Sequence, residues 1–235
     1  MQLMAHRGAS GLAPENTLAA FRLALDYQPD WFELDVHATA DGEIVVMHDA
    51  TVDRTTNGTG AIAGLTLAEI RGLDAGSWKG AEFAGEPVPL LAEVVELAGD
   101  RVRLNVEIKG GPDLPATAAR VVDILRAGGV LGRSEVSSFD LSAVKAVQAL
   151  TDEPALALIT SRPEDLETVI EHGLGWLNLH YAGVSADLVA RAHAAGVGIC
   201  AWTINDLTRW DEFKTLGVDI FCTDLAHQAR PPPSR

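Results

Sequence analysis

Short runs of apolar residues alternate along this chain with longer stretches in which apolar residues recur every three or four positions. The short runs are typical of strands buried on both faces, and the longer stretches are typical of helices with one buried face. The predicted strands are Leu3–His6, Phe32–Val36, Leu104–Ile108, Glu135–Ser138, Ala155–Ile159, Trp176–Leu179, Gly198–Trp202 and Asp219–Cys222. The predicted helices are Glu15–Tyr27, Leu91–Ala98, Ala116–Ala127, Ser142–Leu150, Pro163–His172, Ala186–Ala195 and Asp206–Leu216.

This alternation predicts an α/β fold with a parallel sheet, and the number of strands favours a closed (β/α)8 barrel, or TIM barrel. An open doubly wound sheet is the alternative, although the pattern G-x-G-x-x-G does not follow the first strand. The length of 235 residues suits one barrel. We therefore expect a single domain over residues 1–230 and a disordered, proline-rich tail at 231–235.

Two segments interrupt the alternation between strands and helices. The dipeptide Asp41-Gly42 lies between two extended runs and predicts a β-hairpin. A two-residue turn there would place Asp35 opposite His48, with Glu33 on the same face as Asp35. From residue 50 to residue 90 the chain is rich in glycine and lacks the alternation of strands and helices that is typical of a barrel. This predicts a small insertion after the second strand and its hairpin.

Charged side chains gather at the carboxyl ends of three predicted strands. These ends meet at one rim of a barrel, so we expect the side chains to lie close together. The residues are His6, Arg7, Glu33, Asp35, Glu107 and Lys109. Three clustered carboxylates without cysteine indicate a site for Mg²⁺ or Ca²⁺, because two like unit charges 4 Å apart repel by about 4 kcal/mol at an effective dielectric near 20. An ion-pair network, in which Arg7 and Lys109 neutralise the carboxylates, is the structural alternative.

The overall charge and the cysteines narrow the range of partners and compartments. The 33 acidic and 18 basic residues give a net charge of −15, which disfavours nucleic acids and anionic membranes as partners. Cys200 and Cys222 are too few for a disulfide framework and are typical of a reducing compartment. With neither a leader pattern nor a long apolar run, a cytoplasmic location is expected.

Several motifs along the chain together resemble those of the glycerophosphodiester phosphodiesterase family. In order they are HRG at 6–8, PENT at 14–17, ELDV at 33–36, DGEIVVMHD at 41–49, DRTTNG at 53–58, NVEIK at 105–109, SSFD at 137–140, WTIN at 202–205 and GVDIFCTD at 217–224. The resemblance covers nearly the whole chain. It implies a (β/α)8 barrel with a small insertion, and the metal-dependent hydrolysis of small glycerophosphodiesters to an alcohol and glycerol 3-phosphate.

The resemblance also implies roles for single residues. Glu33, Asp35 and Glu107 would hold the divalent metal, Arg7 and Lys109 would bind the phosphate, and Trp202 would wall the glycerol pocket. His6 and His48 would form the acid–base pair. We assign His6 as the base and His48 as the acid, and the reverse order is the alternative. The substrate would be a small molecule and the protein a monomer or small homo-oligomer. Two other functions stay open: a lysophospholipase D-type activity on the same fold, and a non-catalytic barrel that binds phosphorylated ligands.

Overall fold

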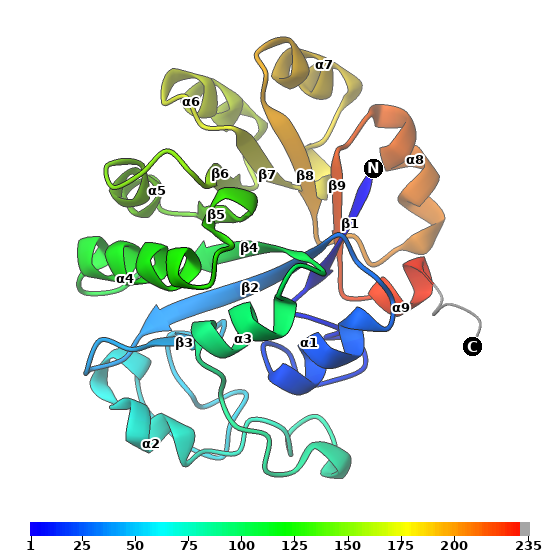
Figure 1. The fold of residues 1–235 in the computed structure, drawn as a ribbon. Coiled ribbons are helices and arrows are strands. Elements are labelled where there is room, and N and C mark those ends of the chain that lie inside the picture. The colour runs from blue at the N-terminus through cyan, green and yellow to red at the C-terminus, as the bar shows by residue number, and fades with distance from the viewer. Residues whose placement is uncertain (231–235) are drawn as a thin grey trace.

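The structure is a computed structural model that describes residues 1–230, and its centre is a closed barrel of parallel strands (Figure 1). The strands are β1 (Gln2–His6), β2 (Trp31–Ala38), β3 (Ile44–Val46), β4 (Arg103–Ile108), β5 (Glu135–Ser138), β6 (Ala155–Thr160), β7 (Trp176–His180), β8 (Gly198–Trp202) and β9 (Ile220–Thr223). The sheet runs β1-β9-β8-β7-β6-β5-β4-β2-β3, and β1 also pairs with β2, so that the sheet closes on itself. This closure confirms the TIM barrel and excludes the open sheet.

Helices surround the barrel and cover the outer face of its strands, except for one short helix within the insertion, α2 (Figure 1). They are α1 (Leu18–Leu25), α2 (Leu67–Arg71), α3 (Leu91–Ala98), α4 (Leu114–Ala127), α5 (Leu141–Gln148), α6 (Leu166–Glu171), α7 (Ala186–Ala194), α8 (Trp210–Leu216) and α9 (Ala226–Ala229). Single 3₁₀ turns occur at Ile62–Gly64, Ala81–Phe83, Leu131–Arg133, Pro163–Asp165, Tyr181–Gly183 and Leu207–Arg209. Within residues 1–230, no helix is both long enough and apolar enough to cross a membrane.

Helix α1 starts three residues later than the sequence pattern predicts. The hydroxyl of Thr17 accepts a hydrogen bond from the backbone N–H of Ala20 (3.2 Å), which caps the helix and fixes its start at Leu18. The residues before this cap, Glu15 and Asn16, are thereby left outside the helix. Their side chains are free to point toward the rim of the barrel.

The strands of the barrel divide their side chains between an apolar outer face and a polar interior. On β2, Phe32, Leu34 and Val36 belong to the main apolar core between strands and helices. The alternate residues Glu33 and Asp35 point the other way, since side chains two apart on a strand share a face. The interior of this barrel is therefore unusually rich in polar and charged groups.

The β2–β3 hairpin has a register that differs by one residue from the predicted one. Val36 pairs with Val46, which places Asp35 opposite Met47 and not opposite His48. The loop contains three residues and ends in Gly42, whose φ of 82° is left-handed. Asp41 does not complete a two-residue turn because its carboxylate accepts hydrogen bonds from the hydroxyl of Thr39 (2.6 Å) and from the backbone at the start of α2.

The segment predicted as an insertion packs against this hairpin, next to β3 (Figure 1). Its apolar side chains form a small core of their own together with hairpin residues. That core consists of Val45, Met47, Val52, Ile62, Ile70, Ala75 and Val88. Because Met47 is part of this second core, the chain leaves the β2–β3 ladder before it reaches His48. The 231–235 tail lies outside the described residues.

Candidate functional site

Three carboxylates from neighbouring strands converge inside one end of the barrel. Glu33 and Asp35 come from β2, and Glu107 comes from β4, where it pairs directly with Asp35. One oxygen from each carboxylate lies within 4.8 Å of the others. All three residues are buried, with Asp35 fully inaccessible to solvent. The structure thus brings together the three residues that the sequence analysis assigned to a metal. We call them the carboxylate cluster.

The carboxylate cluster carries more negative charge than its protein partners neutralise. The guanidinium of Arg7 lies 3.2 Å from Asp35, and the ammonium of Lys109 lies 3.1 Å from Asp35 and 2.6 Å from Glu107. When all three carboxylates are ionised, the two cations leave one negative charge in excess. The ion-pair network of the structural alternative is therefore present, but it is incomplete by itself.

The pKa values of the carboxylate cluster reflect this excess. Burial, together with the neighbouring Asp35, raises the pKa of Glu33 to about 7 and that of Glu107 to about 8. Burial would also raise the pKa of Asp35, but Lys109 and Arg7 outweigh it and hold that pKa well below its usual range. One buried oxygen of Asp35, Oδ1, accepts no well-aligned hydrogen bond. Three carboxylates, one of them with an oxygen that contacts only the ammonium of Lys109 (3.1 Å), fit a hard divalent cation.

His6, at the end of β1, is held by two carboxylates. Its Nδ1 lies 2.6 Å from Asp224 Oδ1, and its Nε2 lies 3.9 Å from Glu33. Asp224, which follows β9, is itself fixed by hydrogen bonds from Ser10 (2.9 Å) and Asn205 (2.6 Å). Burial lowers the pKa of His6, but Glu33 and Asp224 outweigh it, so that the net shift is upward. Asp224 therefore orients the ring and leaves Nε2 directed toward the cluster.

His48, which follows β3, is held in a similar way from the other side of the site. Its Nδ1 lies 2.7 Å from the carboxylate of Asp49, and its backbone carbonyl accepts a hydrogen bond from Nε2 of His37 (3.2 Å). Burial lowers the pKa of His48 and outweighs Asp35 and Asp49, which raise it. In both histidines Nδ1 contacts a carboxylate, which leaves Nε2 available for proton transfer.

Arg7 is locked in place by its backbone and its side chain. Its φ of 56° is left-handed, a conformation uncommon for a residue with a Cβ. The backbone N–H donates to the Glu33 carboxylate (2.9 Å), and Nη1 donates to Glu15 (2.8 Å). This strained turn aims the guanidinium across the carboxylate cluster.

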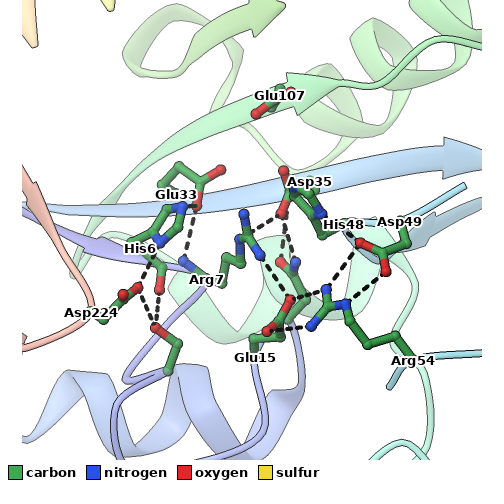
Figure 2. A network of polar contacts seen from close by, with 12 residues as sticks. His6, Arg7, Glu15, Glu33, Asp35, His48, Asp49, Arg54, Glu107 and Asp224 are labelled. Carbon is green, nitrogen blue, oxygen red and sulfur yellow. Dashed lines mark hydrogen bonds and ion pairs between the residues drawn. The ribbon is translucent and has the colours of Figure 1, made fainter. Parts of the chain in front are cut away.

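A chain of ion pairs connects Arg7 to His48 (Figure 2). Arg54 donates to Glu15 (2.8 Å) and also to Asp49 (2.7 Å), so that one guanidinium joins the carboxylate behind Arg7 to the carboxylate behind His48. The sequence analysis did not assign Glu15, Asp49, Arg54 or Asp224 to the site. Glu15 and Arg54 lie within the PENT and DRTTNG motifs, while Asp49 and Asp224 each end a motif, and these motifs were the available signal.

The predicted site residues surround a single hollow of about 120 Å³, which we call the site hollow. All of them line it except Asp35, which is buried behind Arg7 and Lys109. Trp202 forms one wall, held by a hydrogen bond from its indole N–H to the carbonyl of Asn178 (2.9 Å). The ring of Phe139 meets Trp202 edge-on, with 5.6 Å between centroids. The site hollow thus has a charged side and an aromatic side.

Comparison with known proteins places this chain in one family. The family model for the glycerophosphoryl diester phosphodiesterase family matches residues 6–227. A glycerophosphodiester phosphodiesterase of Caldanaerobacter subterraneus subsp. tengcongensis is 37% identical over 226 residues, which cover 94% of this chain and 93% of that protein.

Solved structures agree with this assignment. An Oleispira antarctica phosphodiesterase in complex with the product sn-glycerol-3-phosphate has a TM-score of 0.91 and 34% identity, covering 97% of this chain and 94% of that one. A glycerophosphodiester phosphodiesterase of Agrobacterium tumefaciens has a TM-score of 0.86 and 30% identity, covering 95% and 96%. The fold and the family resemblance expected from the sequence are both confirmed. The chain therefore belongs to the glycerophosphodiester phosphodiesterase family and is a phosphoric diester hydrolase.

Proposed function

We propose that this enzyme hydrolyses small glycerophosphodiesters to glycerol 3-phosphate and an alcohol, with a divalent metal and with His6 and His48 as its acid–base pair. The observation that carries the proposal is the site hollow itself. Two imidazoles, two cations and two of the three clustered carboxylates line one cavity of about 120 Å³, with the third carboxylate directly behind it. The Oleispira antarctica relative, whose structure contains sn-glycerol-3-phosphate, supports the choice of product.

Glu33, Asp35 and Glu107 are the residues that would hold the metal, and their oxygen ligands favour Mg²⁺ or Ca²⁺. When bound, such an ion supplies Lewis-acid stabilisation of charge on the phosphate oxygens. Arg7 and Lys109 add positive charge on the same side of the site hollow. Arg7 offers a planar guanidinium that suits two phosphate oxygens, and Lys109 offers a point charge. Together they offset the repulsion between the phosphodiester and an incoming nucleophile.

The two histidines stand on opposite sides of the phosphate-binding groups. Figure 2 shows His6 with Asp224 on one side of Arg7, and His48 with Asp49 on the other. In phosphoryl transfer the attacking and leaving oxygens lie roughly in line through phosphorus. Two bases on opposite sides match this geometry, because one can face the attacking oxygen and the other the leaving oxygen.

We assign His6 as the base and His48 as the acid. Nε2 of His6 takes a proton from the attacking oxygen, which is that of water or of the glycerol 2-hydroxyl, as a new P–O bond forms. Nε2 of His48 gives a proton to the leaving oxygen as its bond to phosphorus breaks. If the 2-hydroxyl attacks first, water then opens the cyclic phosphate with the two roles reversed. In either case one water is consumed, and Asp224 and Asp49 stabilise the imidazolium form of each ring.

Trp202 and Phe139 are proposed to bind the glycerol arm of the substrate. Trp202 lies on the His6 side, since it ends β8, which pairs with β9, and Asp224 follows β9. Phe139, which follows β5, contacts Trp202 edge-on. Flat apolar rings suit the CH₂ and CH edges of glycerol. The hydroxyl groups of glycerol remain free to reach the polar side of the site hollow.

A two-substrate assay tests this function against its alternatives. Purified protein is given glycerophosphocholine or a lysophospholipid, with Mg²⁺ or with a chelator, and the release of each product is measured. Release of glycerol 3-phosphate from glycerophosphocholine, abolished by the chelator, is the expected result. Release from the lysophospholipid alone would instead identify a lysophospholipase D-type enzyme, and bound metal with no release would identify a non-catalytic phospho-ligand barrel.

We also propose the oligomeric state, the class of substrate and the cellular compartment of the enzyme. Every residue of the site comes from one chain, so a monomer or a small homo-oligomer is sufficient. The net charge of −15 supports a small-molecule substrate over nucleic acid or an anionic membrane. Two buried free cysteines, Cys200 and Cys222, support a reducing compartment such as the cytoplasm. Size-exclusion chromatography and cell fractionation test these points.

A further inference from the structure

A second hollow, of about 210 Å³, lies next to the site hollow on the hairpin side of the barrel, and we call it the hairpin hollow. Its walls come from the hairpin, from the predicted insertion and from the loop after β4. The lining residues are His37, Ala38, Ala50, Ala61, Ala63, Lys109, Gly110, Gly111, Pro112 and Thr117. Lys109 lines both hollows, so they adjoin at one of the two groups proposed to bind the phosphate.

The shape of a phosphodiester matches this pair of hollows. Its phosphorus carries two organic arms, and the glycerol arm is proposed to lie against Trp202 in the site hollow. Because the phosphorus is tetrahedral, the other arm leaves it in a different direction and must occupy other space. Lys109 lines both hollows, whereas Trp202 lines only the site hollow.

His48 stands at the border between the two hollows. It lines the site hollow, and its backbone carbonyl accepts a hydrogen bond from His37, which lines the hairpin hollow. His6 lies on the other side, held by Asp224 from beyond β9. An alcohol that occupies the hairpin hollow would therefore present its leaving oxygen to His48 and not to His6.

The walls of the hairpin hollow indicate which alcohol it accepts. Four of the ten lining residues are alanines and two are glycines, and Lys109 is the only lysine or arginine among them. Among the described residues that line it, none is a carboxylate, tryptophan, tyrosine or phenylalanine, the groups that bind quaternary ammonium ions. A volume of about 210 Å³ suits a small alcohol better than a long acyl chain.

We propose that the hairpin hollow is the subsite for the leaving alcohol, and that it selects small uncharged alcohols over choline and over lysolipids. This inference rests on the proposed function, since it names the leaving group of the same reaction. It also gives a structural reason for the assignment of His48 as the acid.

Two glycerophosphodiesters that differ only in charge test the selectivity. Glycerophosphocholine and its neutral isostere, the 3,3-dimethylbutyl ester of glycerol 3-phosphate, have leaving groups of nearly the same shape. The Mg²⁺-loaded enzyme is expected to show a kcat/KM about tenfold higher for the neutral ester. Equal values, or a preference for the choline ester, would overturn the selectivity.

Variants that fill the hairpin hollow with a larger side chain test whether the leaving alcohol binds there. Ala63→Leu is expected to raise KM for the dimethylbutyl ester about tenfold and to leave the methyl ester of glycerol 3-phosphate nearly unchanged, because a methyl group does not reach the wall. Ala84→Leu is the matched control, since Ala84 is an exposed alanine of the same segment that lines neither hollow. Ala50→Leu repeats the test from another wall if Ala63→Leu does not fold. Parallel losses for both esters would reject the subsite, whereas hydrolysis of no ester at all by the wild type would reject the proposed function instead.

Discussion

The barrel buries carboxylates in two regions, and their surroundings differ sharply. In the carboxylate cluster, Glu33, Asp35 and Glu107 crowd together beside cationic side chains. On β5, Glu135 is alone: one of its oxygens accepts from the amides of Asn105 (2.5 Å) and Asn178 (2.7 Å), and the other has no partner.

The carboxylate cluster needs negative charge for its proposed function, whereas Glu135 is a structural group that is favoured in its neutral form. The carboxylate cluster concentrates negative charge at the open end of the barrel, where a metal and a substrate can reach it. Burial raises the pKa of Glu135 to about 7, which favours a neutral acid surrounded by amides. We therefore expect changes in the cluster to affect activity most, and a change at Glu135 to affect stability.

The largest effect is expected from the histidines beside the carboxylate cluster. His6→Ala and His48→Ala should each reduce kcat by about 10²–10⁴-fold, the usual contribution of a general acid or base. Release of glycerol 3-phosphate measures the loss, and a Mg²⁺ titration that follows Tm serves as the control for metal binding. Near-normal turnover in either variant would remove that histidine from the mechanism.

Removal of one ligand from the cluster comes next. Glu107→Gln should lower activity about a thousandfold, since Lewis-acid stabilisation amounts to several kcal/mol and each 1.36 kcal/mol is a factor of ten. Mg²⁺ should raise the Tm of the wild type but not that of the variant, because only the wild type gains binding energy in the folded state. With a chelator present, the variant should be about as stable as the wild type near neutral pH, because a pKa of about 8 leaves Glu107 largely uncharged without metal. A wild-type Tm that does not change when Mg²⁺ or Ca²⁺ is added would contradict the metal site.

A smaller effect is expected from Arg54, which acts through other residues. Arg54→Ala breaks the connection between Glu15 and Asp49 and should reduce kcat about tenfold, with a changed pH profile as His48 loses its fixed carboxylate. Arg54→Lys should rescue little, because an ammonium does not reproduce the bidentate guanidinium contacts. Arg191→Ala, which removes an exposed arginine paired with Glu167 elsewhere, is the control. Equal kinetics and pH profiles for the Arg54 and Arg191 variants would refute a positioning role.

The smallest effect on activity is expected at Glu135. Glu135→Gln should leave kcat within about twofold but should change how stability depends on pH. The folded-state pKa of about 7 exceeds the ordinary value of 4.5, so the wild type loses stability as pH rises between these values. The variant does not titrate, and its stability relative to the wild type should therefore grow by about 3 kcal/mol from pH 4 to pH 8, at 1.36 kcal/mol per pKa unit. Denaturant unfolding at several pH values measures this. Parallel pH curves for the two proteins would show that Glu135 is not neutral in the fold.

Sequence patterns predicted the barrel well because burial determines which positions are apolar. The same burial of apolar side chains holds the strands and helices of the barrel together. The inward and outward faces of β2 follow directly from Glu33 and Asp35 alternating with Leu34 and Val36. The convergence of the strand ends followed in turn from the closed parallel topology.

These patterns could not predict the register of the hairpin or the residues that hold the two histidines in place. The two-residue turn failed because Asp41 uses its side chain to start α2, an interaction between segments distant in sequence. Asp224 lies 218 positions from His6, and only closure of the barrel between β9 and β1 brings them together. Tertiary contacts of this kind leave no periodic signal in the chain.

The extra residue in the hairpin loop has a consequence for engineering this scaffold. Since Met47 is anchored in the small second core, the position of His48 depends on a segment outside the barrel. Transplanting residues 50–90 from a relative would therefore reposition one half of the proton-transfer pair while the other half stayed fixed to β1. Chimaeras made at this boundary should be screened first for catalysis and only afterwards for a new choice of alcohol.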